Sequence, residues 1–300
     1  MDFFDWLEQR ARQANSLLCV GLDPRGDDAA TVRDECYRLI DATADFACAF
    51  KPNSAFFERL GAPGVAALRE VIARVPADVP VILDAKRADI ADTATAYALS
   101  AFDTLGAHAI TVNPYLGGDA LAPFLARPDR GVFVLCKTSN PGADEFQALN
   151  VGNETIFEIV ARRAAQWSRA RNVGLVLGAT DTAALARARQ AAPDLWFLVP
   201  GVGAQGGDLE AALTAGLRPD GLGLLINASR SIARAADPAL EARQLRDRIA
   251  ERAARSSTAS RDSADRQVER PLSLLAQDLI TSQCVRFGQF RLKSGIVSPI

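Results

Sequence analysis

The sequence predicts an α/β protein built as a closed (β/α)₈ TIM barrel with a short C-terminal extension. Short apolar runs typical of strands recur about every 25–35 residues, helical patterns lie between them, and polar or glycine-rich segments follow the runs. Eight strands are expected, over residues 17–21, 46–51, 81–84, 109–112, 131–137, 174–177, 196–199 and 221–226. An open doubly wound sheet is the alternative, but no G-x-G-x-x-G follows the first run.

The chain divides into a barrel and a tail. Helices are expected over residues 154–171 and 181–190, and the last barrel helix over 238–254. We therefore expect a barrel domain over 1–254. Residues 255–270 are small and charged and predict a linker, and residues 271–300 predict a further short segment. About 30 residues cannot bury a core alone, so this segment docks on another surface or belongs to a larger domain.

Composition narrows the classes of partner. A net charge of −2 and a pI near 5.6 argue against nucleic acid and anionic membranes as partners. No segment predicts a membrane span or a secretory signal. The five cysteines lack C-x-x-C spacing, which favours reduced core thiols in a cytoplasmic protein. The single histidine, His108, enters a strand, so we expect a structural role, and no site with two histidine ligands can form.

Charged residues gather after the second and third predicted strands. Asp84 and Lys86 follow the apolar run 81–83, two positions apart, and Asp89 comes next. Lys51 ends the neighbouring strand, so the four side chains form a row of alternating sign. Carboxylates beside Lys86 favour its ammonium form. Such a row suits a reaction that builds negative charge on carbon and then needs a proton. A structural ion network at the barrel mouth is the alternative.

Further candidates follow other strands. Gly-rich residues 201–207 include Gln205, and residues 227–231 include Arg230; the loops after strands 7 and 8 commonly hold phosphate in this fold, helped by a helix start. Asp23 follows strand 1, and Ser139 follows strand 5 in Thr-Ser-Asn-Pro-Gly, where it can meet a planar polar ligand. Ordinary tight turns are the alternative for each of these loops.

The segment from Leu83 to Thr93 resembles the signature of orotidine 5′-phosphate decarboxylase, with the spacing D-x-K-x-x-D-I-x-x-T intact. The resemblance extends through Gly-Leu-Asp-Pro (21–24), Phe-Lys-Pro-Asn (50–53), Lys-Thr-Ser-Asn-Pro-Gly (137–142), Pro-Gly-Val-Gly-Ala-Gln-Gly-Gly (200–207) and Ala-Ser-Arg-Ser-Ile (228–232). It covers about residues 1–254. The residues of these motifs are similar to those of the bacterial subgroup with Asp-Ala-Lys-Arg-Ala-Asp at its centre.

The resemblance implies decarboxylation of orotidine 5′-monophosphate to UMP, a step of de novo pyrimidine synthesis, without metal or cofactor. Lys86 would protonate C6 of the pyrimidine as CO₂ leaves, and Asp84 would lie beside the substrate carboxylate. Lys51 and Asp89 would complete the row and contact the ribose.

The resemblance also implies the binding residues and a homodimer. Asp89 and Thr93 would reach into the partner's site across the interface. The remaining contacts would be ribose by Asp23, base by Ser139, and phosphate by Gln205 with Arg230.

The tail resembles the opening of orotate phosphoribosyltransferase, through Leu-Leu-Ala-Gln-Asp-Leu-Ile (274–280) and residues 285–300. The ribose-pyrophosphate loop of that family is absent from these residues, so we expect no transferase activity from them. The resemblance implies the first part of a fused two-enzyme polypeptide, or a chain cut short.

Two other functions fit parts of the pattern. A sugar-phosphate lyase or aldolase of related architecture would use carboxylates with a metal, or a lysine Schiff base. A barrel without catalysis, kept as a docking platform for a transferase domain, would not need the complete charged row.

Overall fold

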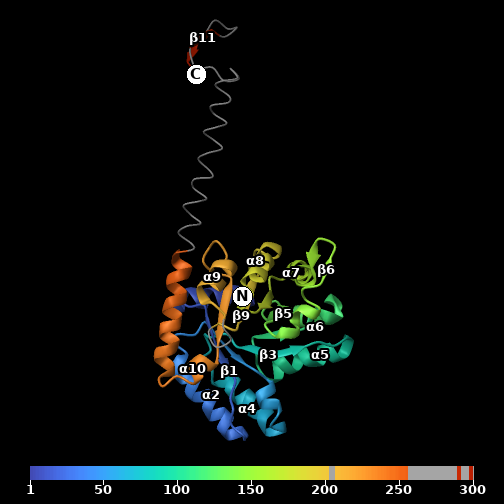
Figure 1. Cartoon of the computed structure of the whole chain (residues 1–300), viewed down its shortest axis with the longest axis vertical. Coiled ribbons are helices and arrows are strands. Elements are labelled where there is room, and N and C mark those ends of the chain that lie inside the picture. The colour runs from blue at the N-terminus through green and yellow to red at the C-terminus, as the bar shows by residue number, and fades with distance from the viewer. Residues whose placement is uncertain (203–206, 256–288, 292–296, 300) are drawn as a thin grey trace.

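A computed structural model describes residues 1–202, 207–255, 289–291 and 297–299. Eight parallel strands form one sheet in the order β2-β1-β10-β9-β8-β5-β4-β3. Parallel bridges between Phe50 and Val81 and between Asn53 and Asp84 join the two edge strands, which closes the sheet into a barrel. Helices surround the strands (Figure 1). The predicted (β/α)₈ class is confirmed, and the open doubly wound sheet was the wrong alternative.

The barrel strands are β1 (Leu18–Leu22), β2 (Ala49–Pro52), β3 (Ile82–Arg87), β4 (Ala109–Val112), β5 (Gly131–Lys137), β8 (Val173–Leu177), β9 (Trp196–Pro200) and β10 (Leu224–Ala228). All eight predicted strands are present, and the largest differences in their ends, of three residues each, occur in three places. β2 begins three residues later than expected, and β3 runs three residues further. β10 begins at Leu224 because Gly221 and Gly223 have positive φ angles of 78° and 84°, which place them in a turn.

The helices are α1 (Phe3–Ala14), α2 (Ala29–Thr43), α3 (Ala55–Glu58), α4 (Gly61–Arg74), α5 (Ala91–Leu99), α6 (Gly118–Leu125), α7 (Ile156–Trp167), α8 (Thr182–Ala191), α9 (Leu209–Gly216) and α10 (Arg230–Ala233). Shorter turns are the π-helix η1 (Ser100–Thr104) and the 3₁₀-helices η2 (Pro114–Leu116) and η3 (Pro141–Glu145). Residues 238–255 are also helical, as the sequence predicts for 238–254. The tenth helix has only four residues.

The helix expected over 154–171 is shorter at both ends. A small antiparallel pair, β6 (Asn150–Val151) and β7 (Glu154–Thr155), comes first. Thr155 then caps α7 in a reciprocal capping box with Glu158, which fixes the first residue of the helix at Ile156. The helix over 181–190 is confirmed with a one-residue shift, because the side chain of Asp181 accepts a hydrogen bond from the N–H of Ala184 and caps α8.

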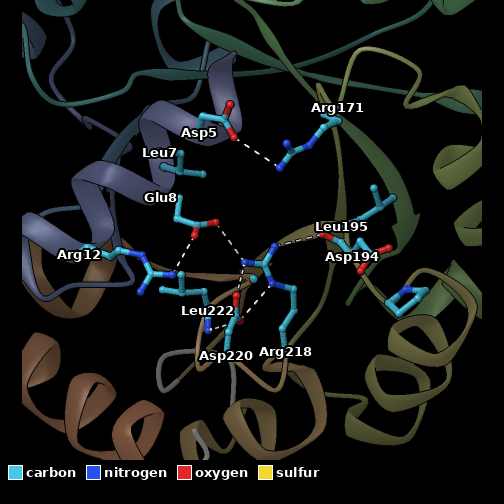
Figure 2. Close-up of polar contacts among 12 residues, drawn as sticks. Asp5, Leu7, Glu8, Arg12, Arg171, Asp194, Leu195, Arg218, Asp220 and Leu222 are labelled. Atoms are coloured by element: carbon cyan, nitrogen blue, oxygen red, sulfur yellow. Dashed lines mark hydrogen bonds and ion pairs between the residues drawn. The ribbon is translucent and has the colours of Figure 1, made fainter. Parts of the chain in front are cut away.

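The N-terminal helix closes the bottom of the barrel, at the amino ends of the strands. Phe3, Phe4 and Leu7 of α1 are buried there against the strands, and Phe4 packs edge-on against Phe133 with ring centroids 5.5 Å apart. The polar side of the helix contributes Glu8, which lies between two arginines (Figure 2). The top of the barrel, where the strands end, is therefore the end left open for a ligand.

His108 has the structural role that the sequence predicts. Its Nδ1 accepts a hydrogen bond from the N–H of Val81 at 3.0 Å, and Trp6 packs edge-on at 4.8 Å between ring centroids. Burial, with a smaller contribution from the charge of Arg130, lowers the pKa of His108 to about 4, so the ring is neutral at pH 7.

The cysteines of the described residues are buried free thiols: Cys19, Cys36, Cys48 and Cys136. Burial raises the pKa of Cys19 to about 12, which keeps it in the thiol form. Across the described ranges, no helix combines the length and apolar character needed to cross a bilayer. The predicted linker, apart from the helical Arg255, and most of the predicted tail lie outside the described residues. Within the tail, β11 (Gln289–Arg291) and β12 (Val297–Pro299) pair antiparallel.

Candidate active site

Three of the four predicted row residues meet at the top of the barrel. The Asp84 carboxylate lies between two ammonium groups: Lys51 Nζ is 2.8 Å from Oδ2, and Lys86 Nζ is 2.6 Å from Oδ1. The Lys51 and Asp84 side chains are 5% and 11% exposed, whereas Lys86 is 48% exposed. Lys86 is therefore the member of the row that faces the solvent-filled space.

Charge pairing fixes the ionisation of the two buried members. Burial alone would raise the pKa of Asp84, but the Lys51 and Lys86 ammoniums outweigh it and hold that pKa well below its usual range. Burial would likewise lower the pKa of Lys51, but the carboxylates of Asp84 and Asp23 offset this effect and raise the pKa above its ordinary value. Around neutral pH the row thus presents fixed charges that need no rearrangement when a ligand enters.

An irregularity in β3 aims the row into the barrel mouth. The pairing of β3 with β4 shifts register between Leu83 and Arg87, and Lys86 has a φ of +48°. An L-residue in this left-handed region is uncommon and is held there by its surroundings. Regular strand alternation predicts Asp84 and Lys86, two positions apart, on one face of the strand. The two side chains do meet, but a bulge with a positive φ brings them together.

A cavity of about 410 Å³ opens beside the row. It is lined by six of the predicted site residues, which are Asp23, Lys51, Asp84, Lys86, Ser139 and Arg230. Its apolar wall comes from Leu135, Val176, Leu198 and Pro200. A few charged groups thus converge on one side of a partly apolar cavity, at the carboxyl ends of the barrel strands. This arrangement is typical of an active site.

The predicted residues Asp89 and Thr93 are not among the described residues that line this cavity. Asp89 Oδ1 accepts a hydrogen bond from the N–H of the adjacent Ile90, at the start of α5. Thr93 is exposed on the same helix. The sequence expectation was that both residues act in a partner's site. Gln205 lies outside the described residues.

Two acceptor groups in the cavity have no partner among the described residues. Asp23 Oδ2 accepts a hydrogen bond from Ser229 Oγ at 2.6 Å, but Asp23 Oδ1 is buried without a donor, and so is the side-chain oxygen of Asn227. Buried unpaired acceptors are uncommon, so hydroxyl or N–H donors of a ligand are their natural partners. Sequence reasoning assigned Asp23 and missed Asn227; the signal available was a polar residue inside an otherwise apolar strand.

Arg230 begins α10 at the cavity mouth and is exposed. The helix starts after the two predicted phosphate loops are those of α9 and α10, and α10 is a single turn of four residues. A contribution of these helix starts to anion binding stays a prediction. The guanidinium, with its fork of donors, is then the group of the described residues best suited to hold a phosphate at this side of the mouth.

Comparison with known proteins identifies the family of the chain. Residues 16–245 match the model of the "Orotidine 5'-phosphate decarboxylase / HUMPS family". The chain belongs to this family.

Relatives named as orotidine 5′-phosphate decarboxylase cover most of the barrel. The protein of Thermomicrobium roseum is 50% identical over an alignment of 269 residues, and the match covers 83% of this chain and 95% of that protein. The protein of Roseiflexus castenholzii is 48% identical over 266 residues, covering 83% of this chain and 97% of that protein.

Solved structures of family members agree with the architecture. The Leishmania donovani OMP decarboxylase is 58% identical with a TM-score of 0.81, covering 84% of this chain and 99% of that one. The Leishmania donovani UMP synthase is 56% identical with a TM-score of 0.81, and the match covers 100% of this chain and 64% of that one.

Proposed function

We propose that this chain is a carbon–carbon lyase that decarboxylates orotidine 5′-monophosphate to UMP in pyrimidine synthesis, with no metal and no cofactor. The observation that carries the proposal is the Asp84 carboxylate held between the Lys51 and Lys86 ammoniums, at 2.8 and 2.6 Å, beside a cavity. Family membership and relatives near 50% identity support it. The four row residues are Lys51, Asp84, Lys86 and Asp89.

The chemical step needs stabilisation of charge at C6. The bond from C6 to the carboxylate breaks, CO₂ leaves, and the electron pair remains on C6. The Lys86 ammonium then donates a proton to C6, which gives UMP. A positive charge already fixed beside the developing carbanion lowers the reorganisation energy of the reaction. The transition state is then stabilised more than the bound substrate, which raises kcat. Asp84 fixes Lys86 and lies on the side where the substrate carboxylate is lost.

Contacts remote from C6 bind the nucleotide. In this proposal the unpaired Oδ1 of Asp23 accepts from a ribose hydroxyl, Ser139 contacts the base, and Arg230 with Gln205 holds the phosphate. The apolar wall formed by Leu135, Val176 and Leu198 suits one face of a pyrimidine ring. Binding energy from ribose and phosphate then holds the ring against the charged row.

We further propose a homodimer in which Asp89 and Thr93 complete the partner's site. Helix α5 supports this arrangement, since Ala94 and Ala98 are its buried residues. Ile90 beside it is 60% exposed, Leu99 on it is 51% exposed, and Tyr115 in η2 is 86% exposed. Exposed large apolar side chains such as these are typical of an interface.

Mixing two inactive variants tests the shared site. Lys86→Ala removes the proton donor of a protomer's own site, and Asp89→Asn removes the carboxylate given to the partner. In a mixed dimer one site carries both changes and the other carries neither. We expect an equal mixture, after exchange of subunits, to recover about a quarter of wild-type activity, because half of the dimers are mixed and each has one intact site. No recovery, with mixed dimers verified by mass, would show that Asp89 serves its own protomer.

A metal-dependent sugar-phosphate lyase of related architecture is the main rival. It would need carboxylates free to bind an ion. Here each oxygen of Asp84 already contacts a lysine ammonium. Within the described ranges, there is no group of three or more His, Cys, Asp or Glu side chains that could hold a metal ion. The Schiff-base version of this rival would be revealed by trapping with borohydride.

The direct test is a spectrophotometric assay with orotidine 5′-monophosphate, run with and without EDTA. We expect turnover to UMP at the same rate in both conditions. Loss of activity with EDTA would favour the metal-dependent rival. Binding of UMP without turnover of substrate would favour a barrel kept as a docking platform.

We also propose that residues 271–300 belong to the start of an orotate phosphoribosyltransferase-like domain, that 255–270 link it to the barrel, and that the enzyme works in the cytoplasm. The tail's resemblance to that family and the match of the whole chain to a UMP synthase support the domain assignment. Buried free thiols in the described barrel support the location. A chain ending at residue 254 should keep its kcat, and fractionation of cells should recover the full chain from the cytosol.

A further inference from the structure

We propose that Thr111 is a positioning residue for the reaction, because its hydroxyl holds both the Asp84 carboxylate and the strained backbone of Lys86 in place. The inference rests on the proposed decarboxylase function and adds to it a residue outside the charged row. Thr111 lies on β4, next to β3, and lines the same cavity as the row. It is only 1% exposed.

The Thr111 hydroxyl makes three hydrogen bonds. Oγ1 donates to Asp84 Oδ1 at 3.0 Å, and it accepts from the N–H of Ala85 at 3.1 Å and from the N–H of Lys86 at 3.0 Å. A hydroxyl offers one donor and two acceptor lone pairs, so its full capacity is used here. All three bonds reach the segment that carries the proposed proton donor.

The bulge in β3 explains why a hydroxyl is needed at this position. Leu83 pairs with Ile110, and the next paired residue, Arg87, lies opposite Val112. Residues 84–86 therefore all lie opposite Thr111. The N–H groups of Ala85 and Lys86 point to its side chain, and that side chain satisfies them.

Loss of the hydroxyl would release two constraints at once. Lys86 holds a φ of +48° while its N–H is bonded to Thr111. Asp84 Oδ1 is shared between Thr111 and Lys86 Nζ, which lies 2.6 Å away. Without the hydroxyl, the Asp84 carboxylate can rotate and the Lys86 backbone can relax, so the ammonium no longer points to C6. Contacts to ribose and phosphate come from other strands and would remain.

The test compares Thr111→Val with Thr111→Ser. Valine keeps the shape and removes the hydroxyl, whereas serine keeps the hydroxyl. We expect Thr111→Val to lower kcat about 10- to 100-fold, with KM for orotidine 5′-monophosphate and Kd for UMP within about threefold of wild type. Thr111→Ser should recover most of the kcat. Thr111→Cys, whose thiol is a weaker donor and acceptor, should lie between them and serves if the valine variant does not fold.

Thr43→Val is the matched control. Thr43 is fully buried in α2, and its hydroxyl donates to the carbonyl of Leu39 at 2.7 Å, away from the cavity. It should leave kcat unchanged. Crystal structures of the Thr111 variants give a readout independent of activity: Lys86 should leave the positive φ region in the valine variant and keep it in the serine variant.

Two results would overturn the proposal. One is a wild-type kcat in Thr111→Val; the other is equal damage by valine and serine to kcat and UMP binding together, which would mark a packing role. Absence of turnover in the wild-type chain would instead refute the decarboxylase function, and the Lys86 backbone in the variant structures would still decide the role of Thr111.

Discussion

The two ends of the barrel both carry charges of alternating sign, but they use different residues in different surroundings. At the top, three residues of the row, Lys51, Asp84 and Lys86, meet, and Lys51 and Asp84 are nearly removed from water. At the bottom, Glu8 lies between Arg12 and Arg218, at 2.8 and 3.2 Å. Alternation of charge is therefore not by itself a mark of catalysis in this molecule.

The bottom network joins distant parts of the chain. Arg218 Nη2 also lies 2.7 Å from Asp220 Oδ2, and its Nη1 donates to the carbonyl of Asp194 (Figure 2). These bonds tie the helix α1 to the loop before β10. Arginine keeps its proton under all ordinary conditions and offers five donors in a rigid plane. Such a group fastens elements together and has no proton to give.

The top row is built in the opposite way. A lysine ammonium carries a proton that it can transfer, and burial of Lys51 and Asp84 makes their charges act at low dielectric. Buried ion pairs contribute little to stability compared with apolar residues of the same size, because desolvation offsets the attraction. The row is therefore better explained by chemistry than by stability, whereas the bottom network is explained by the connection it makes.

The largest expected difference between the ends comes from removing Lys86. Lys86→Ala should lower kcat by about 10⁴-fold or more, since both the proton donor and the fixed positive charge are lost. UMP should still bind, because ribose and phosphate contacts remain. Steady-state kinetics and calorimetry with UMP measure the two effects. Residual turnover within tenfold of wild type would remove Lys86 from its proposed role.

Substitution of Arg230 tests phosphate binding at the cavity mouth separately from the chemistry of the charged row. Arg230→Ala should lower kcat/KM for orotidine 5′-monophosphate by about 10³-fold, because the proposed charge-assisted hydrogen bonds from its guanidinium to the phosphate would be lost. The reaction of the nucleoside orotidine, which has no phosphate, should barely change. Parallel assays with both substrates measure this contrast. Equal losses on both substrates would place the phosphate elsewhere.

As the pH falls, protonation of His108 should reduce stability at the bottom of the barrel before Asp84 in the row is protonated. The folded pKa of His108, about 4, is below its ordinary value of 6.5. The neutral ring therefore contributes stability that is fully present above pH 6.5 and is lost as the pH falls through 4, by about 3 kcal/mol in total. Asp84, whose pKa is lowered further, stays ionised across that window.

Urea unfolding between pH 7 and pH 4 measures the contribution of His108, with His108→Gln as the control that should lack most of the pH dependence. An unchanged pH dependence in His108→Gln would assign the acid sensitivity to other groups.

Lys51 has a raised pKa, so its contribution to stability is lost only as the pH rises past its ordinary value of 10.5.

The smallest effect is expected from the bottom network. Arg218→Gln should reduce the free energy of unfolding by about 1–2 kcal/mol, since its ion pairs are partly exposed. The kcat should stay within about twofold of wild type, because Arg218 lies at the other end of the barrel from the row. Chemical denaturation and steady-state kinetics test the two parts. A large loss of kcat in folded Arg218→Gln would erase the distinction between the ends.

The sequence predicted the barrel because its signals are local. Each strand is a short apolar run, and the polar residues at the strand ends must meet once the sheet closes, which is why Lys51 and Asp84 could be paired from 33 residues apart. The features missed are those set by the tertiary structure. Thr111 looks like an ordinary strand residue, and its three bonds depend on a bulge in the neighbouring strand. Nothing in the neighbouring sequence predicts the positive φ angle of Lys86 either.

The central claim is that Lys86, held against Asp84, delivers the proton to C6. By microscopic reversibility the same side chain, in its neutral amine form, must accept the C6 proton of UMP in the reverse direction. In D₂O, proton NMR of UMP should show exchange of C6–H for deuterium catalysed by the wild-type protein and abolished by Lys86→Ala, while both proteins bind UMP. Exchange at the wild-type rate in Lys86→Ala would contradict the account.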